Sequence, residues 1–252
     1  INVFQSVGEL FSCLPMNKVK LHTLWLLGML FLMTACGDDD DYYYPSVKLE
    51  FVTVKAGADG LIQSLLPDKG ELLTVAKDRT GSTISPNSAR RVISNYEVNP
   101  EDATAVIYSL QSVVTPEPKG ADDPAFEGGL KYDPVDVTSI WLGRDYLNMI
   151  LNVKININSG KQHVFGMIEE SVESEGDETV VTLSLFHDAN GDEENYNRRA
   201  YISVPLTKYV DEENPHQTIR IKFKYHTTDK SGVVVESSKY CDPGFEYVPG
   251  VN

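Results

Sequence analysis

Apolar and polar residues alternate with a period of two along most of the chain, a pattern that predicts short β-strands. In the first half, Val47, Leu49 and Phe51 are expected to share one strand face, opposite the charged residues between them. Further strands of this half are expected at residues 72–76, 91–96 and 104–110. Turn-rich sequence separates these segments, and about five short strands within residues 46–115 fit a small β-barrel.

The second half, residues 135–228, alternates more cleanly. Its strands are expected at residues 147–157, 163–168, 181–185, 202–206 and 219–225. One apolar face per strand is typical of antiparallel sheets covered on one side, which predicts a β-sandwich. No segment shows a sustained helical period. The expected fold class is therefore all-β, a small OB-like barrel followed by an antiparallel β-sandwich.

Two stretches fall outside this alternation. Residues 116–134 contain four prolines and three glycines among several acids, which predicts a linker between the two domains because proline lacks the N–H that a β-ladder needs. Residues 229–252 are weakly patterned and are expected to form a tail, or a final strand near residues 233–235.

Before these domains lies a segment typical of a bacterial lipoprotein signal. Lys18 and Lys20 precede the apolar run 24–33, which is too short to span a bilayer, and the small residue Ala35 stands directly before Cys36. We expect cleavage before Cys36 and lipidation of its thiol. The leader is then residues 1–35, with Met16 as the expected start and residues 1–15 as upstream sequence.

The segment that begins at the cysteine, residues 36–45, is expected to be a solvated tether, because adjacent carboxylates repel one another and resist burial. Its acids are Asp38, Asp39, Asp40 and Asp41. The alternative to a plain spacer comes from resemblance: such acids look like the signal that exports lipoproteins to the cell surface in Gram-negative anaerobes. The expected location is the outer membrane, exposed at the cell surface, with a periplasm-facing anchor as the alternative.

The net charge and the cysteine content exclude some classes of partner and of covalent cross-link. Loss of the leader removes one acid and two bases, leaving 36 acidic and 20 basic residues and a formal net charge of −16. Such a chain repels nucleic acid, which is therefore not an expected partner. Cys241 would be the one remaining free thiol, so no intramolecular disulfide is expected in the mature chain.

A candidate metal site lies at Asp188, Asn190 and Asp192, where oxygen ligands alternate as in the first half of a calcium loop. The pattern then fails, because Glu193 stands where such a loop needs glycine and Arg199 where it needs glutamate. The alternative is a β-hairpin, since Asn-Gly between strands is the strongest short hairpin signal. We favour the hairpin.

Catalytic motifs are not evident. The four histidines of the two domains show no metal-ligand spacing, and the adjacent pair His187 and Asp188 should point to opposite faces of a strand. No nucleophile elbow, phosphate-binding loop or zincin motif is present. Residues 141–147, rich in aromatic and charged side chains, are interpreted as a structural plug at the end of the sandwich, with a binding surface as the alternative. No enzymatic activity and no cofactor are expected.

Several segments together resemble the NigD-like lipoproteins. They are Cys36 with the acids behind it, residues 45–52, residues 141–147 and residues 198–206. The resemblance covers residues 36–228. It implies an amino-terminal OB-type domain followed by a β-sandwich, and an association with a bacteriocin locus, without an established activity or site residues.

The expected function is therefore that of a lipid-anchored, non-enzymatic binding module of the envelope. Its expected partners are the membrane, through the lipid, and a protein or glycan of unknown identity. An alternative is a glycan-binding accessory lipoprotein of a nutrient-uptake system.

Overall fold

The structure is a computed structural model that describes residues 47–175, 178–192, 195–215 and 217–250. The expected signal segment, Cys36 and the four acids of the tether lie outside these residues, as does His216. Within the described part of the chain, no helix has the length and apolar character needed to cross a membrane.

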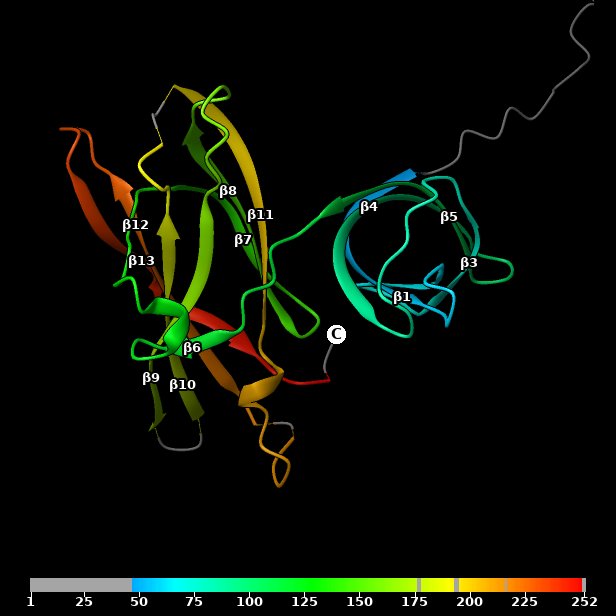
Figure 1. Ribbon diagram of the computed structural model, residues 1–252. Coiled ribbons are helices and arrows are strands. Elements are labelled where there is room, and N and C mark those ends of the chain that lie inside the picture. The colour runs from blue at the N-terminus through cyan, green and yellow to red at the C-terminus, as the bar shows by residue number, and fades with distance from the viewer. Residues whose placement is uncertain (1–46, 176–177, 193–194, 216, 251–252) are drawn as a thin grey trace, which may run out of the picture. The chain divides into compact units, whose positions relative to one another are not determined.

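The first domain is a closed five-stranded barrel (Figure 1). Its strands are β1 (Val47–Ala56), β2 (Ile62–Pro67), β3 (Leu73–Asp78), β4 (Ala89–Asn99) and β5 (Thr104–Ser112). They close in the order β1-β2-β3-β5-β4, and only the β3–β5 pair is parallel. The barrel predicted from the alternation is confirmed, although the position of β2 was not foreseen.

The strand faces of β1 differ from the simple expectation. Val52 and Val54 point into the barrel and are fully buried, whereas Phe51 is buried on the outside of the barrel. Leu49, expected to share a core face with Phe51, is 69% exposed. β1 therefore carries apolar residues on both faces, because its outer face meets the second domain.

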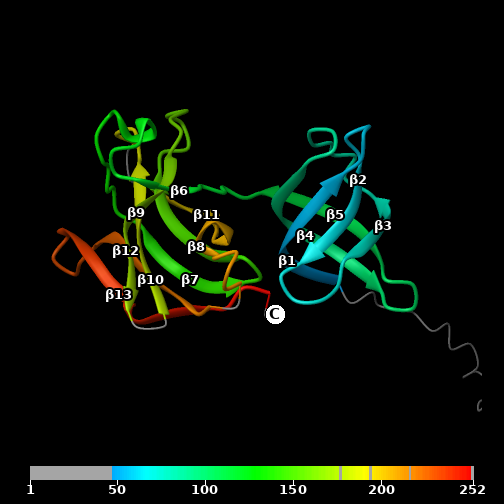
Figure 2. The same ribbon diagram turned by 90° about the horizontal axis from the view of Figure 1, so that it is seen from below.

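The second domain consists of two sheets packed face to face (Figure 2). One sheet has the order β13-β12-β10-β9-β6 and the other β11-β8-β7. Its strands are β6 (Pro118–Gly120), β7 (Asp136–Gly143), β8 (Tyr146–Ile155), β9 (Val164–Glu175), β10 (Glu178–Asp188), β11 (Tyr196–Pro205), β12 (Ile219–Thr228) and β13 (Val234–Tyr247). Two 3₁₀ turns, η1 (Pro124–Phe126) and η2 (Thr207–Tyr209), accompany them.

The sandwich core is formed by residues that alternation placed on the apolar strand faces. The inward side chains of β8, β10, β11 and β12 are buried between the two sheets. They include Leu147, Met149, Leu151, Leu183, Ile202, Val204, Ile221 and Phe223. The predicted sandwich is therefore confirmed. The first strand predicted for this domain, residues 147–157, is shorter than expected, because β8 ends at Ile155 and Ile157 beyond it is 66% exposed.

Three features of the second domain correct the sequence-based expectations. The sheets are not wholly antiparallel: β10 pairs in parallel with β12, and β6 with β9, because the chain visits the other sheet between β10 and β12. The predicted linker 116–134 contains β6 and η1. Of the two alternatives for the carboxy-terminal segment, the final strand is present and the tail is not: β13 begins at Val234, pairs with β12 and extends to Tyr247, beyond the predicted residues.

Candidate binding site at the junction of the two β-domains

The outer face of the barrel packs against the outer face of the sheet β11-β8-β7. Phe51, Ile93 and Val113 are buried there, and they contact Trp141 and Tyr201 of the second domain. The ring of Phe51 meets that of Trp141 edge to face, with 5.3 Å between centroids. Such pairs add about 0.5–1.5 kcal/mol beyond the burial of their area. The junction is therefore a small apolar core.

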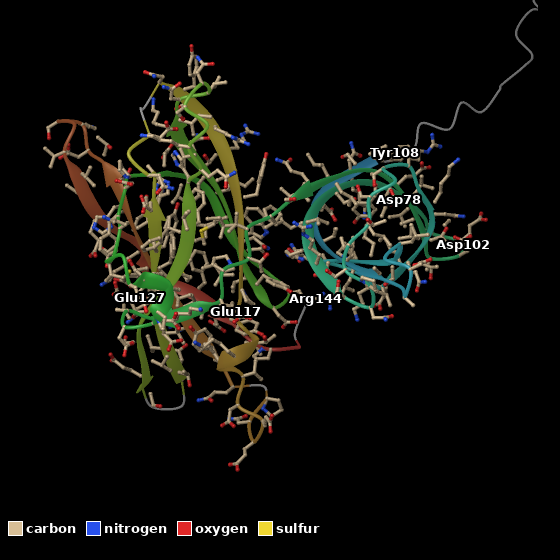
Figure 3. All side chains as sticks on the ribbon, viewed as in Figure 1. Asp78, Asp102, Tyr108, Glu117, Glu127 and Arg144 are labelled. Atoms are coloured by element: carbon tan, nitrogen blue, oxygen red, sulfur yellow. The ribbon has the colours of Figure 1, made fainter. Side chains whose placement is uncertain are left out.

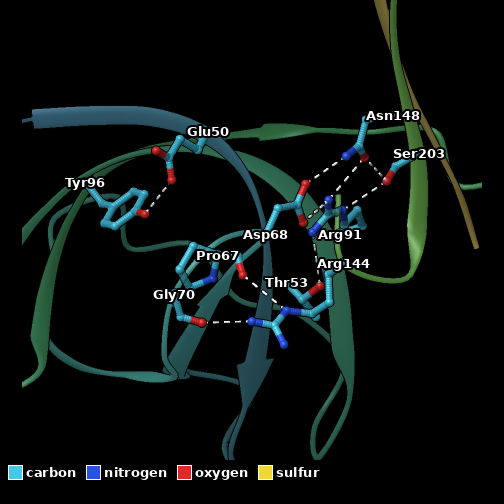
Figure 4. A network of polar contacts seen from close by, with 10 residues as sticks. All are labelled: Glu50, Thr53, Pro67, Asp68, Gly70, Arg91, Tyr96, Arg144, Asn148 and Ser203. Carbon is cyan, nitrogen blue, oxygen red and sulfur yellow. Dashed lines mark hydrogen bonds and ion pairs between the residues drawn. The ribbon is translucent and has the colours of Figure 1, made fainter. Parts of the chain in front are cut away.

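A buried arginine lies beside the ring of Phe51, and Figure 4 shows its polar partners. Arg91 is 4% exposed and comes from β4 of the barrel. Its Nη2 donates to Asp68 Oδ1 at 2.5 Å and to Asn148 Oδ1 at 3.1 Å, and its Nε donates to Ser203 Oγ at 3.0 Å. The guanidinium thus joins a carboxylate of its own domain to two polar side chains of the sandwich.

The partners of Arg91 are also bonded to one another. Asn148 Nδ2 donates to Asp68 Oδ2 at 2.7 Å, and Ser203 Oγ donates to Asn148 Oδ1 at 2.6 Å. Asn148 and Ser203 lie directly opposite each other in the β8–β11 ladder, which fixes their spacing. A buried charge is tolerated only when it is paired and hydrogen-bonded, and this network meets that requirement.

The turn between β7 and β8 completes the junction. A Cβ at Gly143 would lie 2.1 Å from Asp68 Oδ2, which is a steric clash. Glycine at this position therefore leaves room for the carboxylate of Asp68. Arg144 has a φ of +49° and reaches toward the barrel (Figure 3). Its Nη2 donates to the carbonyl of Gly70 at 2.8 Å, and its Nε to that of Pro67 at 3.3 Å. Residues 141–147 therefore have the predicted structural role, but they have it at the junction of the two domains. The prediction that they plug the end of the sandwich is wrong.

A cavity of about 360 Å³ opens beside this junction. Its walls are mainly apolar and aromatic, a composition typical of ligand sites. The apolar lining residues are Leu49, Phe51, Ile93, Trp141, Leu142, Ile150 and Tyr201.

The two acidic side chains at the cavity are already engaged in hydrogen bonds within the protein. The carboxylate of Asp68 is engaged by Arg91 and Asn148, and that of Glu50 accepts a hydrogen bond from Tyr96 Oη at 2.8 Å. Burial, together with this bond to Glu50, raises the pKa of Tyr96.

Two cationic side chains at the cavity are available to contact a ligand. Among the described residues, Lys69 and Arg199 form no ion pair or hydrogen bond through their side chains. The cavity therefore suits an apolar group that carries a negative charge nearby.

The candidate calcium residues lie at a turn between the two sheets. Asn190 and Gly191 both have positive φ values, +52° and +62°. The expected hairpin is wrong, because β10 pairs with β9 and β12 while β11 pairs with β8. The Asn-Gly turn is present, but it crosses from one sheet of the sandwich to the other.

The oxygen atoms of this turn serve local hydrogen bonds. Asp188 Oδ1 accepts from the backbone N–H of Asn190 at 2.7 Å, and Asp192 Oδ2 accepts from that of Asn156 at 2.9 Å. Within the described ranges, no group of three or more His, Cys, Asp or Glu side chains is placed to hold a metal ion.

Two histidines that are distant in sequence meet in the sandwich. His163 Nδ1 lies 2.9 Å from His187 Nε2, and His187 Nδ1 lies 2.9 Å from the carbonyl oxygen of Asp133. The ring of Phe165 stacks on His187 at 4.6 Å. Burial lowers the pKa of His187, so the ring is suited to a neutral, structural role. The sequence offered no spacing signal for this pair.

The remaining cysteine lies in β13. Cys241 Sγ is 3.5 Å from the carbonyl oxygen of Phe223, and burial raises the pKa of the thiol. A thiol with a raised pKa is less reactive, because the thiolate is the nucleophile. The described structure thus places Cys241 in a sheet of the sandwich.

The fold and junction define a two-domain β protein in which an OB-type barrel is followed by a β-sandwich. Residues 51–113 match the profile of the NigD-like N-terminal OB domain, and residues 118–236 that of the NigD-like C-terminal β-sandwich domain. The chain belongs to the NigD-like family, which confirms the resemblance seen in the sequence.

Solved structures agree with this assignment. A NigD-like immunity protein from Bacteroides caccae is 70% identical, with a TM-score of 0.74, and the match covers 82% of this chain and 100% of that one. A protein of unknown function from Bacteroides vulgatus shares the fold at 18% identity, with a TM-score of 0.58 and coverage of 82% and 96%. No match was found among curated proteins.

Proposed function

We propose that this chain is a non-enzymatic binding protein of the bacterial envelope that acts in immunity to a bacteriocin. The observation that carries the proposal is the cavity at the junction, with apolar walls and the cationic side chains of Lys69 and Arg199 at hand. The 70% identical relative is named an immunity protein, which supports a protective role. Protection by binding requires a shaped surface and no reacting group.

The polar groups of the junction support a binding role in a second way. A hydrogen-bonded network holds the two domains together, and its members are Arg91, Asp68, Asn148 and Ser203. A rigid site loses less conformational freedom when it binds a partner, so more of the contact energy appears as affinity. The network therefore serves to preorganise the cavity.

The location of the chain is part of the proposal. A lipid on Cys36 would hold the protein at the outer membrane, and the acids Asp38 to Asp41 would direct it to the cell surface. At the surface, the protein would meet a bacteriocin before the toxin reaches its target. Attachment to the periplasmic face and glycan binding remain the alternative predictions.

Deletion of the gene from its host bacterium tests the proposed function. We expect the deletion strain to be inhibited by culture supernatants from at least one bacteriocin-producing isolate of related bacteria, and the complemented strain to resist them. A double variant, Lys69→Glu with Arg199→Glu, should fail to protect because it reverses both free charges at the cavity.

The matched control reverses two exposed barrel lysines that do not line the cavity, Lys55→Glu with Lys77→Glu, and should protect fully. Surface labelling must show equal amounts of each variant. Equal sensitivity of the deletion and complemented strains to every supernatant tested would refute the immunity role.

A further inference from the structure

One edge of the sheet β11-β8-β7 is only partly covered. β11 is an outer strand of this sheet, with β8 on its inner side. On its outer side, Val114 N donates to the carbonyl of Tyr201, and Ser203 N donates to the carbonyl of Val114, both at 2.9 Å. The segment after β5 thus covers the second half of β11.

The first half of β11 has no such cover. Because Tyr201 and Ser203 direct their backbone groups outward, the residues two and four positions before Tyr201 do the same. These are Arg199 and Asn197, and in the described part of the chain no hydrogen bond reaches their outward backbone groups. An uncovered edge of this kind is a template for another strand.

Two cavities meet along this edge. The junction cavity lies on the outer face of the sheet, and a second cavity of about 800 Å³ lies along Tyr196–Tyr201. Both are lined by Gln111, Arg199 and Tyr201. A strand placed on the edge of β11 would therefore have space for its side chains on both sides.

The charge at this edge is opposite to that of the whole protein. Arg198 and Arg199 are exposed, and neither forms an ion pair or a side-chain hydrogen bond among the described residues. The full chain has a formal net charge of −15. Two unpaired arginines beside an open strand edge favour an acidic partner.

We propose that β11 binds an extended, acidic polypeptide segment of a partner protein by strand addition. The backbone of the segment would pair with Asn197 and Arg199, its carboxylates would meet Arg198 and Arg199, and one apolar side chain would enter the junction cavity. A second copy of this chain is a poor occupant, because its own arginines would meet these two across the edge. This inference rests on the proposed binding function and specifies the partner.

Random peptides displayed on phage and selected on the purified protein provide the probe. We expect the selected sequences to combine apolar residues with acidic residues on both faces of the bound strand, because Arg198 and Arg199 are adjacent in β11 and point to opposite faces. Binding of a selected peptide should slow amide hydrogen exchange at Asn197 and Arg199. Asn197→Pro removes an outward N–H while sparing the bonds to β8, and should weaken binding at least about tenfold.

The matched control is Asn197→Ala, which removes the same side chain but keeps the N–H, and should bind nearly as well as the wild type. If Asn197→Pro impairs folding, Arg198→Glu with Arg199→Glu supplies the second test and should also weaken binding at least about tenfold. Selected peptides without acids, exchange protection elsewhere, or peptide binding unaffected by these variants would each overturn the inference.

Self-association through β11, detected by sedimentation and abolished by Asn197→Pro, would also overturn the proposal of an acidic partner. The two proposals can fail separately. If Asn197→Pro still protects cells against supernatants that inhibit the deletion strain, strand addition is wrong but the immunity role stands.

Discussion

Replacing Arg91 with Ala is expected to lower the free energy of unfolding by about 3–5 kcal/mol, the usual effect of removing one partner from a buried ion pair. The loss arises because the partly buried Asp68 carboxylate and the buried Asn148 lose their shared donor. The cation–π contact of Arg91 with the ring of Tyr146, at 4.3 Å, is lost as well.

Urea denaturation followed by circular dichroism measures this effect. The control is Arg90→Ala at the neighbouring position, where the exposed side chain makes a single bond of 3.4 Å to Ser112. That change should stay within about 0.5 kcal/mol of the wild type. If the two variants are equally stable, Arg91 does not hold the junction.

Changing Cys36 to Ala is expected to move the protein from the membrane fraction to the soluble fraction. The thiol of Cys36 is the proposed attachment point of the lipid, and the substitution removes it. Fractionation of cells that express each variant, followed by immunoblotting, measures the distribution. Cys241→Ala is the matched control and should remain in the membrane fraction, because Cys241 lies in β13. Membrane retention of Cys36→Ala would refute the anchor.

The sandwich was the most predictable part of the fold. Its strands bury one face, so alternation alone places residues such as Leu183, Ile221 and Phe223 in the core. Sheet order was not predictable in this way, because alternation says which face is buried and not which strand lies alongside. The parallel pair β10–β12 and the turn at Asn190 follow from that order.

The candidate site was largely hidden from sequence reasoning. Arg91 and Ser203 are 112 residues apart, and nothing in the local pattern around either indicates that they meet. One signal was available: β1 has apolar residues on both faces, with Phe51 outward and Val52 inward. A strand with two apolar faces in a small barrel indicates that another surface covers the outside.

The central claim is that the two β-domains meet in one fixed junction that carries the binding cavity. Trp141 lies in that junction and is the single tryptophan after the expected leader, so its fluorescence reports on the contact directly. During urea denaturation, we expect Trp141 fluorescence and far-ultraviolet circular dichroism to change at the same urea concentration. A Trp141 transition at lower urea, with the circular dichroism still native, would contradict a fixed junction.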